Sequence, residues 1–338
     1  MPVFASCQDR HCRVMIDSII SEFKSEENAM KTFRFVPLFF FFVLSAVSQP
    51  SDSPRQNGFI PAQNAQLYYE IMGSGEPVVI LHGGPGLDHT YLLPQFEALS
   101  KHYKLILYDQ RSSGKSTGVV DSIHITPQQF VEDLEAVRKY FNLDKMNLIG
   151  HSWGGFLAME YAIKYPERIK TLILVSSLGA NSDCIAPFMK NREERTTHAD
   201  SVALANVLSS DAFAKREPKV VAEFTRISFA VYFYDRSRED SLTLNFNQET
   251  ANNFLPIYGL MSKYFGHYDV YAQLTVIHSP VLILHGDYDP IPSKFSEQLT
   301  KYLQNSKFVL LKNCGHFPFV ETPVELFGEC EKFLGPTR

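Results

Sequence analysis

Short apolar runs recur along the chain after residue 58 and alternate with segments whose pattern is helical. Continuous apolar runs rich in Val, Ile, Leu and aromatic residues suit strands that are buried on both faces. The clearest helix spans Thr126 to Leu143, where Thr126 can cap the helix, Pro127 takes its first turn and Gln129 completes a capping box. This alternation predicts an α/β fold with a mostly parallel sheet flanked by helices. The expected strands are Leu67–Met72, Pro77–Leu81, Lys104–Tyr108, Lys145–Ile149, Thr171–Ser176, Pro280–Leu284 and Lys307–Leu311.

The alternation stops after Ser177 and resumes at Pro280, with two more helices expected near the end, at Pro292–Leu303 and Glu321–Leu334. Residues 178–277 lack strand-like runs and contain polar, helix-favouring stretches such as Asn191–Leu208 and Glu217–Tyr232. We interpret this block as a helical cap inserted into an α/β core formed by residues 59–177 and 278–338. Such a cap is a place where substrate selectivity could be set.

The segment Phe35–Val47 is almost wholly apolar and follows Lys31 and Arg34. It is too short for the roughly 20 residues that span a bilayer, but it suits the centre of a secretory signal peptide. We therefore expect residues 1–48 to be a leader whose true start is Met30, with cleavage near Ser48 and Gln49 and a linker over 49–58. The mature protein would be periplasmic or secreted, with no stable membrane insertion, whereas a retained leader would anchor it to a membrane.

Composition narrows the function classes. Of 338 residues, 45% are hydrophobic and 20% charged, which is typical of a globular protein. The net charge of −5 is mild, and Lys and Arg are scattered, so the sequence does not favour nucleic acid as a partner. Outside the leader, the cysteines are Cys184, Cys314 and Cys330, which have no paired zinc spacing and permit at most one disulfide within the chain. We expect no metal.

One motif carries a candidate nucleophile. Gly150-His151-Ser152-Trp153-Gly154 matches Gly-x-Ser-x-Gly and lies between a predicted strand and a predicted helix. A strained strand-to-helix turn that exposes a serine needs glycines two positions to either side. The alternative is a plain glycine-rich turn without chemistry. We interpret Ser152 as a catalytic nucleophile.

A serine hydroxyl needs a base within hydrogen-bond reach, and the late chain supplies one. His316 follows the last expected strand, in Cys314-Gly315-His316-Phe317-Pro318. Two carboxylates, Asp287 and Asp289, follow the preceding strand. We prefer Asp289, because serine hydrolases with a Gly-x-Ser-x-Gly turn usually carry the acid three residues past the glycine that follows this strand, here Gly286. The order Ser, Asp, His is the one expected of α/β hydrolases. The acid would hold the imidazole tautomer and stabilise the imidazolium.

Acyl transfer also requires donors for the developing oxyanion. His82-Gly83-Gly84-Pro85-Gly86 follows the strand that ends at Leu81, where the second donor of this fold arises. We assign this role to the backbone N–H groups of Gly84 and Trp153. The alternative is a Pro-Gly turn that binds nothing.

Taken together, these motifs and Asp109-Gln110-Arg111 with Gly114-Lys115-Ser116 resemble the proline iminopeptidase family of α/β-hydrolase serine peptidases, over about residues 59–335. The resemblance implies release of an N-terminal residue, often proline, from short peptides, without a cofactor. It also implies that acidic cap residues bind the free amino end. The candidates are Glu193, Glu194, Glu217 and Glu223, each of which could equally be a solvated helix residue.

Two departures from that family leave the substrate open. Narrowly proline-specific members often have Gly at the position of His151, and Ser112-Ser113 replaces the Gly that usually follows Asp-Gln-Arg. The leading hypothesis is an aminopeptidase that forms an acyl-enzyme on Ser152. The alternatives are a carboxylesterase or carbon–carbon bond hydrolase with the same triad, and a binding protein that has lost activity. The nucleophile, base, acid and oxyanion loop are all present, which argues against a binding protein that has lost activity.

Overall fold

The computed structural model describes residues 55–335, all of which fall in one folded unit. The predicted leader, its Met30 start and its cleavage site lie outside the described residues. Within the described part, no helix is both long and apolar enough to cross a bilayer.

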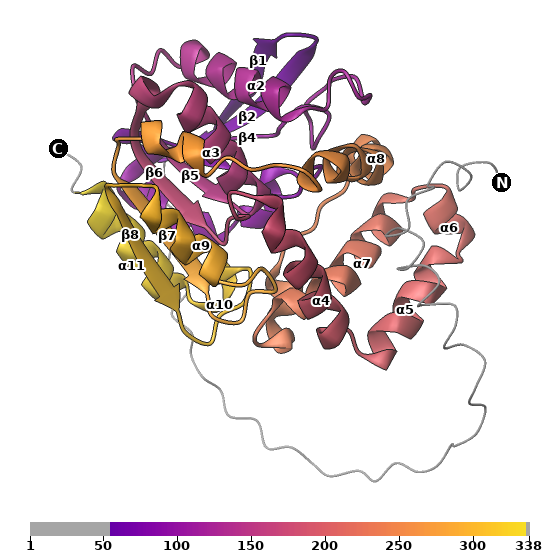
Figure 1. The fold of residues 1–338 in the computed structure, drawn as a ribbon. Helices are drawn as coiled ribbons and strands as arrows, with labels where there is room; N and C mark the ends of the chain where they lie inside the picture. Colours follow the sequence, from indigo (N-terminus) through magenta and orange to yellow (C-terminus); the bar gives the residue numbers. More distant parts are fainter. Residues whose placement is uncertain (1–54, 336–338) are drawn as a thin grey trace, which may run out of the picture. The chain divides into compact units, whose positions relative to one another are not determined.

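The central element is an eight-stranded sheet with the order β1-β2-β4-β3-β5-β6-β7-β8 (Figure 1). The first two strand pairs are antiparallel and all others are parallel. Strands β5 and β7 are buried at every position, and since successive residues point to opposite faces, both faces of the sheet are covered. The strands are β1 (Gln56–Ala62), β2 (Ala65–Met72), β3 (Glu76–Leu81), β4 (Tyr103–Tyr108), β5 (Met146–His151), β6 (Ile169–Val175), β7 (Val281–Gly286) and β8 (Ser306–Leu311).

This sheet confirms the predicted α/β-hydrolase fold, and all seven expected strands are present. The eighth, β1, begins at Gln56, inside the segment that was expected to be a linker. Its sequence contains Gly and Pro and only two strongly apolar residues, Phe59 and Ile60, so it lacks the pattern of a buried strand. As an edge strand paired only with β2, it has no need of one.

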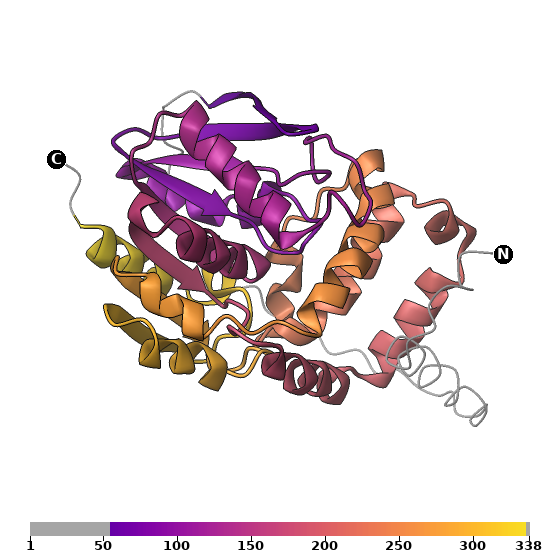
Figure 2. The same ribbon diagram turned by 45° about the horizontal axis from the view of Figure 1, so that its top comes forward.

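The helices of the core follow the expected positions with shorter bounds. Helix α2 (Pro127–Tyr140) begins after Thr126, whose hydroxyl accepts from the N–H of Gln129 at 3.3 Å. Helices α2 and α3 (Trp153–Lys164) lie side by side over the sheet (Figure 2). Near the end of the chain, the helix expected at Pro292–Leu303 is present as the shorter α9 (Lys294–Gln298) followed by a 3₁₀ turn. The helix expected at Glu321–Leu334 is present as α11 (Pro323–Leu334), and the short α10 (Pro318–Glu321) precedes it. Pro323 has no N–H to continue α10, so α11 starts there.

The insertion between β6 and β7 contains helices and no named strand, and Figures 1 and 2 show its helices together beside the sheet. Its two ends are pinned together, because Ser182 N–H donates to Tyr268 O at 2.9 Å and Val270 N–H donates to Ala180 O at 2.8 Å. Backbone hydrogen bonds therefore join the first and the last segment of the cap. Its helices are α4 (Ile185–Arg195), α5 (His198–Leu208), α6 (Asp211–Ala214), α7 (Pro218–Phe229) and α8 (Gln248–Phe265).

Candidate active site

Ser152 occupies a sharp turn between β5 and α3. Its φ of 57° and ψ of −121° lie in a region that L residues rarely adopt, and its side chain is only partly buried. The turn is held by a hydrogen bond from Ser152 N–H to Val175 O at 2.9 Å, while Ser152 O accepts from Gly155 and Phe156. A strained and partly exposed serine at the start of a helix is the geometry of a nucleophile elbow.

The glycines around Ser152 are required by close backbone packing. A Cβ on Gly150 would lie 2.3 Å from Gly154 O, and a Cβ on Gly154 would lie 2.4 Å from Leu81 O. Both distances are shorter than any real carbon contact, so side chains at these positions would push the turn apart. The glycines of the motif are therefore needed for the close packing of α3 against β3 and β5.

His316 and Asp289 lie together at the carboxyl end of the sheet. Asp289 Oδ2 accepts a hydrogen bond from His316 Nδ1 at 2.8 Å, and both residues are buried. Burial alone would raise the pKa of Asp289, but the charges of His316 and His285 hold it below its usual value. With Nδ1 bonded to a carboxylate, Nε2 is the imidazole nitrogen left to accept a proton from a serine.

The competing carboxylate, Asp287, has a different place. It is exposed, its Oδ1 accepts from Cys314 N–H at 3.3 Å, and Lys312 lies 3.7 Å from its Oδ2. Between the two acids, the structure pairs Asp289 with His316. Asp287 instead ties the loop after β8 to the loop after β7.

Two glycines allow the backbone to approach the loop after β7 and the cap closely around His316. A Cβ on Gly286 would meet Gly315 O at 2.2 Å, and a Cβ on Gly315 would meet Tyr232 O at 2.0 Å. The loop of His316 is held further by Glu321, whose Oε2 accepts from Gly315 N–H at 2.7 Å and whose Oε1 accepts from the N–H groups of Tyr234 and Asp235. Glu321 therefore joins the histidine loop to the cap. Sequence reasoning missed this role, because a glutamate at a helix end gives no distinctive signal.

The glycine-rich loop after β3 lies against Ser152. A Cβ added to Gly83 would be 3.1 Å from Ser152 Cβ. The N–H of Gly83 is used, since it donates to Tyr91 Oη at 2.6 Å, whereas the N–H of Gly84 has no acceptor within residues 55–335. Trp153 is the first residue of α3, so its N–H has no partner within the helix. Gly84, which adjoins Gly83, and Trp153, which adjoins Ser152, thus each have a backbone N–H without an acceptor in these turns.

His151 links this glycine-rich loop to the histidine loop. Its Nδ1 lies 2.6 Å from Tyr91 Oη, and its Nε2 donates to the main-chain carbonyl of His316 at 2.7 Å. A carbonyl can only accept, so Nδ1 accepts from the tyrosine hydroxyl. Complete burial lowers the pKa of His151 to about 3, which keeps the ring neutral. The sequence presented His151 only as the variable residue of the serine motif, and nothing there pointed to Tyr91.

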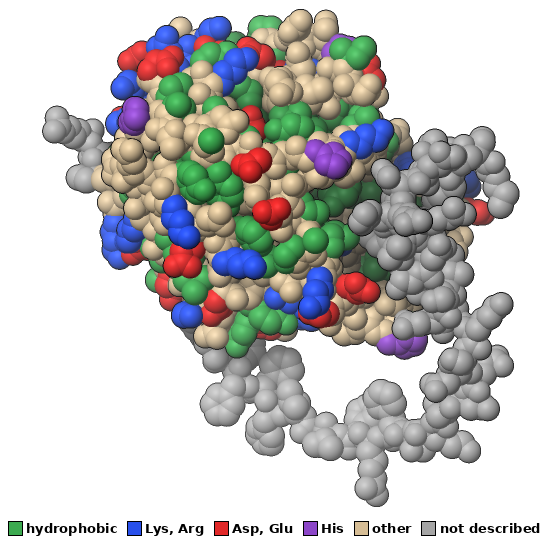
Figure 3. All heavy atoms as spheres, in the orientation of Figure 1, with side chains coloured by type: hydrophobic (Ala, Val, Ile, Leu, Met, Phe, Trp, Pro, Cys, Tyr) green, Lys and Arg blue, Asp and Glu red, His purple; other side chains and the backbone are tan. Residues whose placement is uncertain are grey.

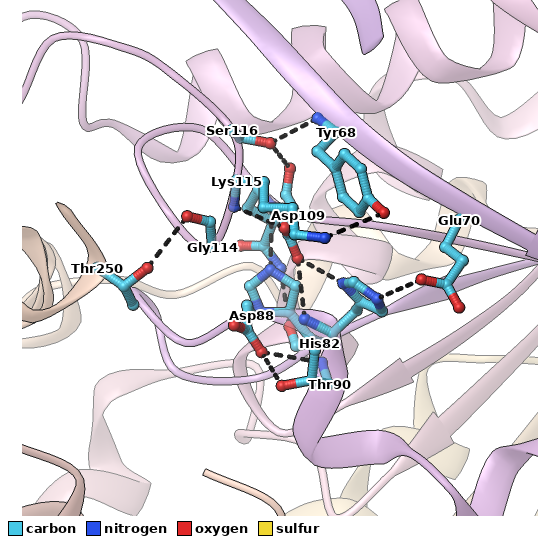
Figure 4. Close-up of polar contacts among 12 residues, drawn as sticks. Tyr68, Glu70, His82, Asp88, Thr90, Asp109, Gly114, Lys115, Ser116 and Thr250 are labelled. Carbon is cyan, nitrogen blue, oxygen red and sulfur yellow. Dashed lines mark hydrogen bonds and ion pairs between the residues drawn. The ribbon is translucent and has the colours of Figure 1, made fainter. Parts of the chain in front are cut away.

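Asp109 and Gln110 of the Asp109-Gln110-Arg111 motif form hydrogen bonds that hold the loops around Ser152 in place. Asp109 Oδ1 accepts from His89 N–H at 3.1 Å and from His89 Nδ1 at 2.7 Å, and Oδ2 accepts from Lys115 N–H at 2.8 Å (Figure 4). Gln110 Nε2 donates to His82 O, and its Oε1 accepts from Trp153 Nε1, both at 2.7 Å. These bonds fix the loop relative to the serine turn, so the motif is structural here.

The four cap carboxylates that the family resemblance nominated all lie on exposed faces. Glu193 and Glu194 are in the last turn of α4, Glu217 precedes α7 and Glu223 lies within α7. Glu194 pairs with Lys190 at 3.5 Å along the helix surface. No hydrogen bond or ion pair among the described residues joins any of the four to Ser152, His316 or Asp289. On the face drawn in Figure 3, acidic and basic side chains of the described residues are interspersed.

The described residues contain no group of His, Cys, Asp and Glu that could hold a metal ion. Cys184, Cys314 and Cys330 are buried and unpaired, and burial raises the pKa of all three thiols. Protonated buried thiols are unreactive.

The fold and this arrangement define an α/β hydrolase, and the alpha/beta hydrolase fold family matches residues 76–323, so the chain belongs to that family. Within it the chain is proline iminopeptidase-like. The proline iminopeptidase of Heyndrickxia coagulans is 28% identical over 290 residues, which cover 82% of this chain and 98% of the relative. That of Lactobacillus delbrueckii subsp. bulgaricus is 30% identical over 286 residues, covering 78% and 92%. A crystal structure of the Mycobacterium smegmatis proline iminopeptidase covers 82% of this chain and 97% of its own, with 21% identity and a TM-score of 0.61, a likeness of fold.

Proposed function

We propose that this hydrolase is an aminopeptidase that releases N-terminal residues, proline or other small apolar residues, from short peptides. The observation that carries the proposal is the buried hydrogen bond between Asp289 and His316, in a protein whose serine turn has the geometry of a nucleophile elbow. The names of the relatives, proline iminopeptidases, support the choice of substrate.

In the proposed reaction, Ser152 Oγ attacks the scissile carbonyl and its proton passes to His316 Nε2. The oxyanion accepts hydrogen bonds from the N–H groups of Gly84 and Trp153. The leaving amine takes the proton from His316, which leaves an acyl group on Ser152. Water then attacks this ester by the same route, with Asp289 holding the imidazole throughout.

Turnover of prolyl and alanyl arylamides by protein lacking residues 1–48 tests the proposal. Cleavage that disappears in Ser152→Ala supports it. A fluorophosphonate probe should label the wild type and Cys314→Ala but not Ser152→Ala. Rapid cleavage of simple esters without any turnover of arylamides would reject the peptidase activity.

One observation favours a second candidate, a carboxylesterase or carbon–carbon bond hydrolase with the same triad. All four cap carboxylates proposed to bind a substrate amine are exposed, and within the part of the chain that the structure describes none forms a hydrogen bond or ion pair with the candidate triad. A substrate without a free amine needs no such anchor. A panel that contains p-nitrophenyl esters beside the arylamides separates the two.

Export is a further part of the proposal, and it rests on the sequence of residues 30–49 alone. N-terminal sequencing of protein recovered outside the cytoplasm tests it, and a mature end far from Gln49 would contradict it.

A further inference from the structure

The cap contains a half-buried arginine that has no acidic partner among the described residues. Arg192 lies in α4, and neither an Asp nor a Glu among residues 55–335 lies within 4.0 Å of its guanidinium. Its Nε is buried without a hydrogen-bond partner, and the one polar contact of the group is from Nη1 to the sulfur of Met189 at 3.8 Å. A guanidinium has five N–H donors, so most of its bonding capacity is unused.

Arg192 is placed close to the candidate catalytic histidine. Its guanidinium carbon lies 5.5 Å from the ring centroid of Tyr232, and that ring lies 5.1 Å from the imidazole of His316. The helix that carries it is fixed beside the acid loop, because Asn191 Nδ2 donates to Pro290 O at 2.9 Å and Arg195 Nη1 donates to Tyr288 O at 2.6 Å. A single aromatic ring therefore separates the guanidinium from the imidazole.

An unpaired cation in such a place is unfavourable unless a ligand compensates it. Removing part of a charge from water is unfavourable, and contacts with the rings of Phe188 and Tyr232 compensate only a part of that cost. Arg192 keeps part of its surface exposed, so an anion can reach it. The planar guanidinium matches a carboxylate through two parallel hydrogen bonds.

We propose that Arg192 binds the free C-terminal carboxylate of a di- or tripeptide whose scissile carbonyl lies at Ser152. This inference rests on the proposed aminopeptidase function and names its substrate class. One extended residue spans at most about 3.6 Å. The distances of 5.5 Å from the Arg192 guanidinium to the Tyr232 ring and of 5.1 Å from that ring to the His316 imidazole therefore suit a carboxylate one or two residues beyond the scissile bond. The cap then recognises the end of a short peptide by its negative charge.

Two substrates that differ only in this charge test the inference: alanyl-alanine and alanyl-alaninamide. Wild type should cleave the free acid with a kcat/KM at least tenfold higher than the amide. Arg192→Met should bring the two values to within about twofold, mainly by raising KM for the acid, and Arg192→Lys should retain part of the preference. Lys190→Met, which removes an exposed cation of the same helix, should leave the preference unchanged.

If Arg192 had only a structural role, Arg192→Met would lower the melting temperature and leave the ratio of acid to amide cleavage unchanged. A role in binding the carboxylate predicts the reverse. Because Arg192→Met removes a half-buried charge that has no acidic partner, its melting temperature should equal or exceed that of the wild type. Should this variant not fold, inhibition of the wild type decides: N-acetylalanine should compete with fluorophosphonate labelling, and N-acetylalaninamide should not. Equal cleavage of acid and amide by wild type, with a ratio unaffected by Arg192→Met, would overturn the inference and leave the aminopeptidase function standing.

Failure of the function itself would look different. If no peptide is cleaved but esters are, the aminopeptidase proposal falls. The charge preference can then be measured with mono-p-nitrophenyl glutarate against p-nitrophenyl butyrate, where a preference for the glutarate that Arg192→Met abolishes would support an anion site. Equal rates would overturn that site as well.

Discussion

His151 Nε2 donates a hydrogen bond of 2.7 Å to the main-chain carbonyl of His316, so the residue before the candidate nucleophile holds the loop of the candidate base. The other nitrogen of the same ring accepts from Tyr91, which in turn accepts from Gly83 N–H. The three loops of the site are thus joined by one buried chain of hydrogen bonds. Because burial lowers the pKa of His151 to about 3, its ring stays neutral in the working pH range and the direction of these bonds does not change.

Replacing His151 by Leu should lower kcat by about 10- to 100-fold with little change in KM. The variant leaves the Tyr91 hydroxyl and the His316 carbonyl without partners and lets the two loops drift relative to Ser152. His151→Gln retains one donor and one acceptor and should recover most of the loss. The rate of fluorophosphonate labelling measured beside thermal unfolding checks this. A Leu variant with unchanged kcat and labelling would show that the chain of bonds is not needed for positioning.

Asp289 and Asp287 offer a matched pair of substitutions. Asp289→Asn should lower kcat by on the order of 10³- to 10⁴-fold, since an amide no longer holds the His316 tautomer or stabilises its charged form. Asp287→Asn should change kcat by less than a few fold, because Asp287 is exposed and contacts only the loop backbone and Lys312. Steady-state kinetics of both variants decides the assignment, and a larger loss in Asp287→Asn would reverse it.

Seven of the eight strands and the tight turn at Ser152 could be predicted from the sequence, because both depend on local patterns. Buried strands read as apolar runs, and the serine turn reads as glycines at fixed spacing, since backbone atoms fill the places where a Cβ would be. The edge strand β1 was missed because a strand with one partner does not need that pattern. Near the C-terminus, the short helix α10 that precedes Pro323 was not predicted from apolar periodicity.

The side chains that support the site were harder to predict, since their roles depend on distant contacts. Tyr91 is 60 residues from His151 in the chain, and Glu321 reaches across to residues 234 and 235. The cap shows the same limit. Its glutamates were nominated by residue type, yet all four are exposed, while the half-buried charge near His316 is an arginine that no motif marked.

Protonation of His89 should make stability depend on pH above neutrality. Burial alone would lower the pKa of His89, but its hydrogen bond to Asp109 and its contact with Glu70 raise it to about 10. The folded state therefore holds a proton that the unfolded chain releases near pH 6.5. This contribution, on the order of a few kcal/mol, is fully present below pH 6.5 and is lost as the pH rises toward about 10.

Urea unfolding of wild type and His89→Gln at pH 7 and at pH 10 measures that contribution. The difference between the two proteins in the free energy of unfolding should be large at pH 7 and smaller at pH 10. The neighbouring Asp88, whose pKa burial and the charge of Asp109 raise to about 6, titrates below this window. A difference that stays constant from pH 7 to pH 10 would mean that His89 is not the titrating group.

Adding one methyl group at Gly315 should disable the site while leaving most of the core intact. Its Cβ would lie 2.0 Å from Tyr232 O, which is backbone and cannot rotate away, so the His316 loop must move. Gly315→Ala should therefore lower kcat by at least about 100-fold, because a displacement near 1 Å is enough for losses of that size. Gly328→Ala, where nothing lies within 4 Å of the added carbon, is the matched control and should retain full activity. Near-normal kcat in Gly315→Ala would show that the loop tolerates displacement and that the close approach to Tyr232 does not position the base.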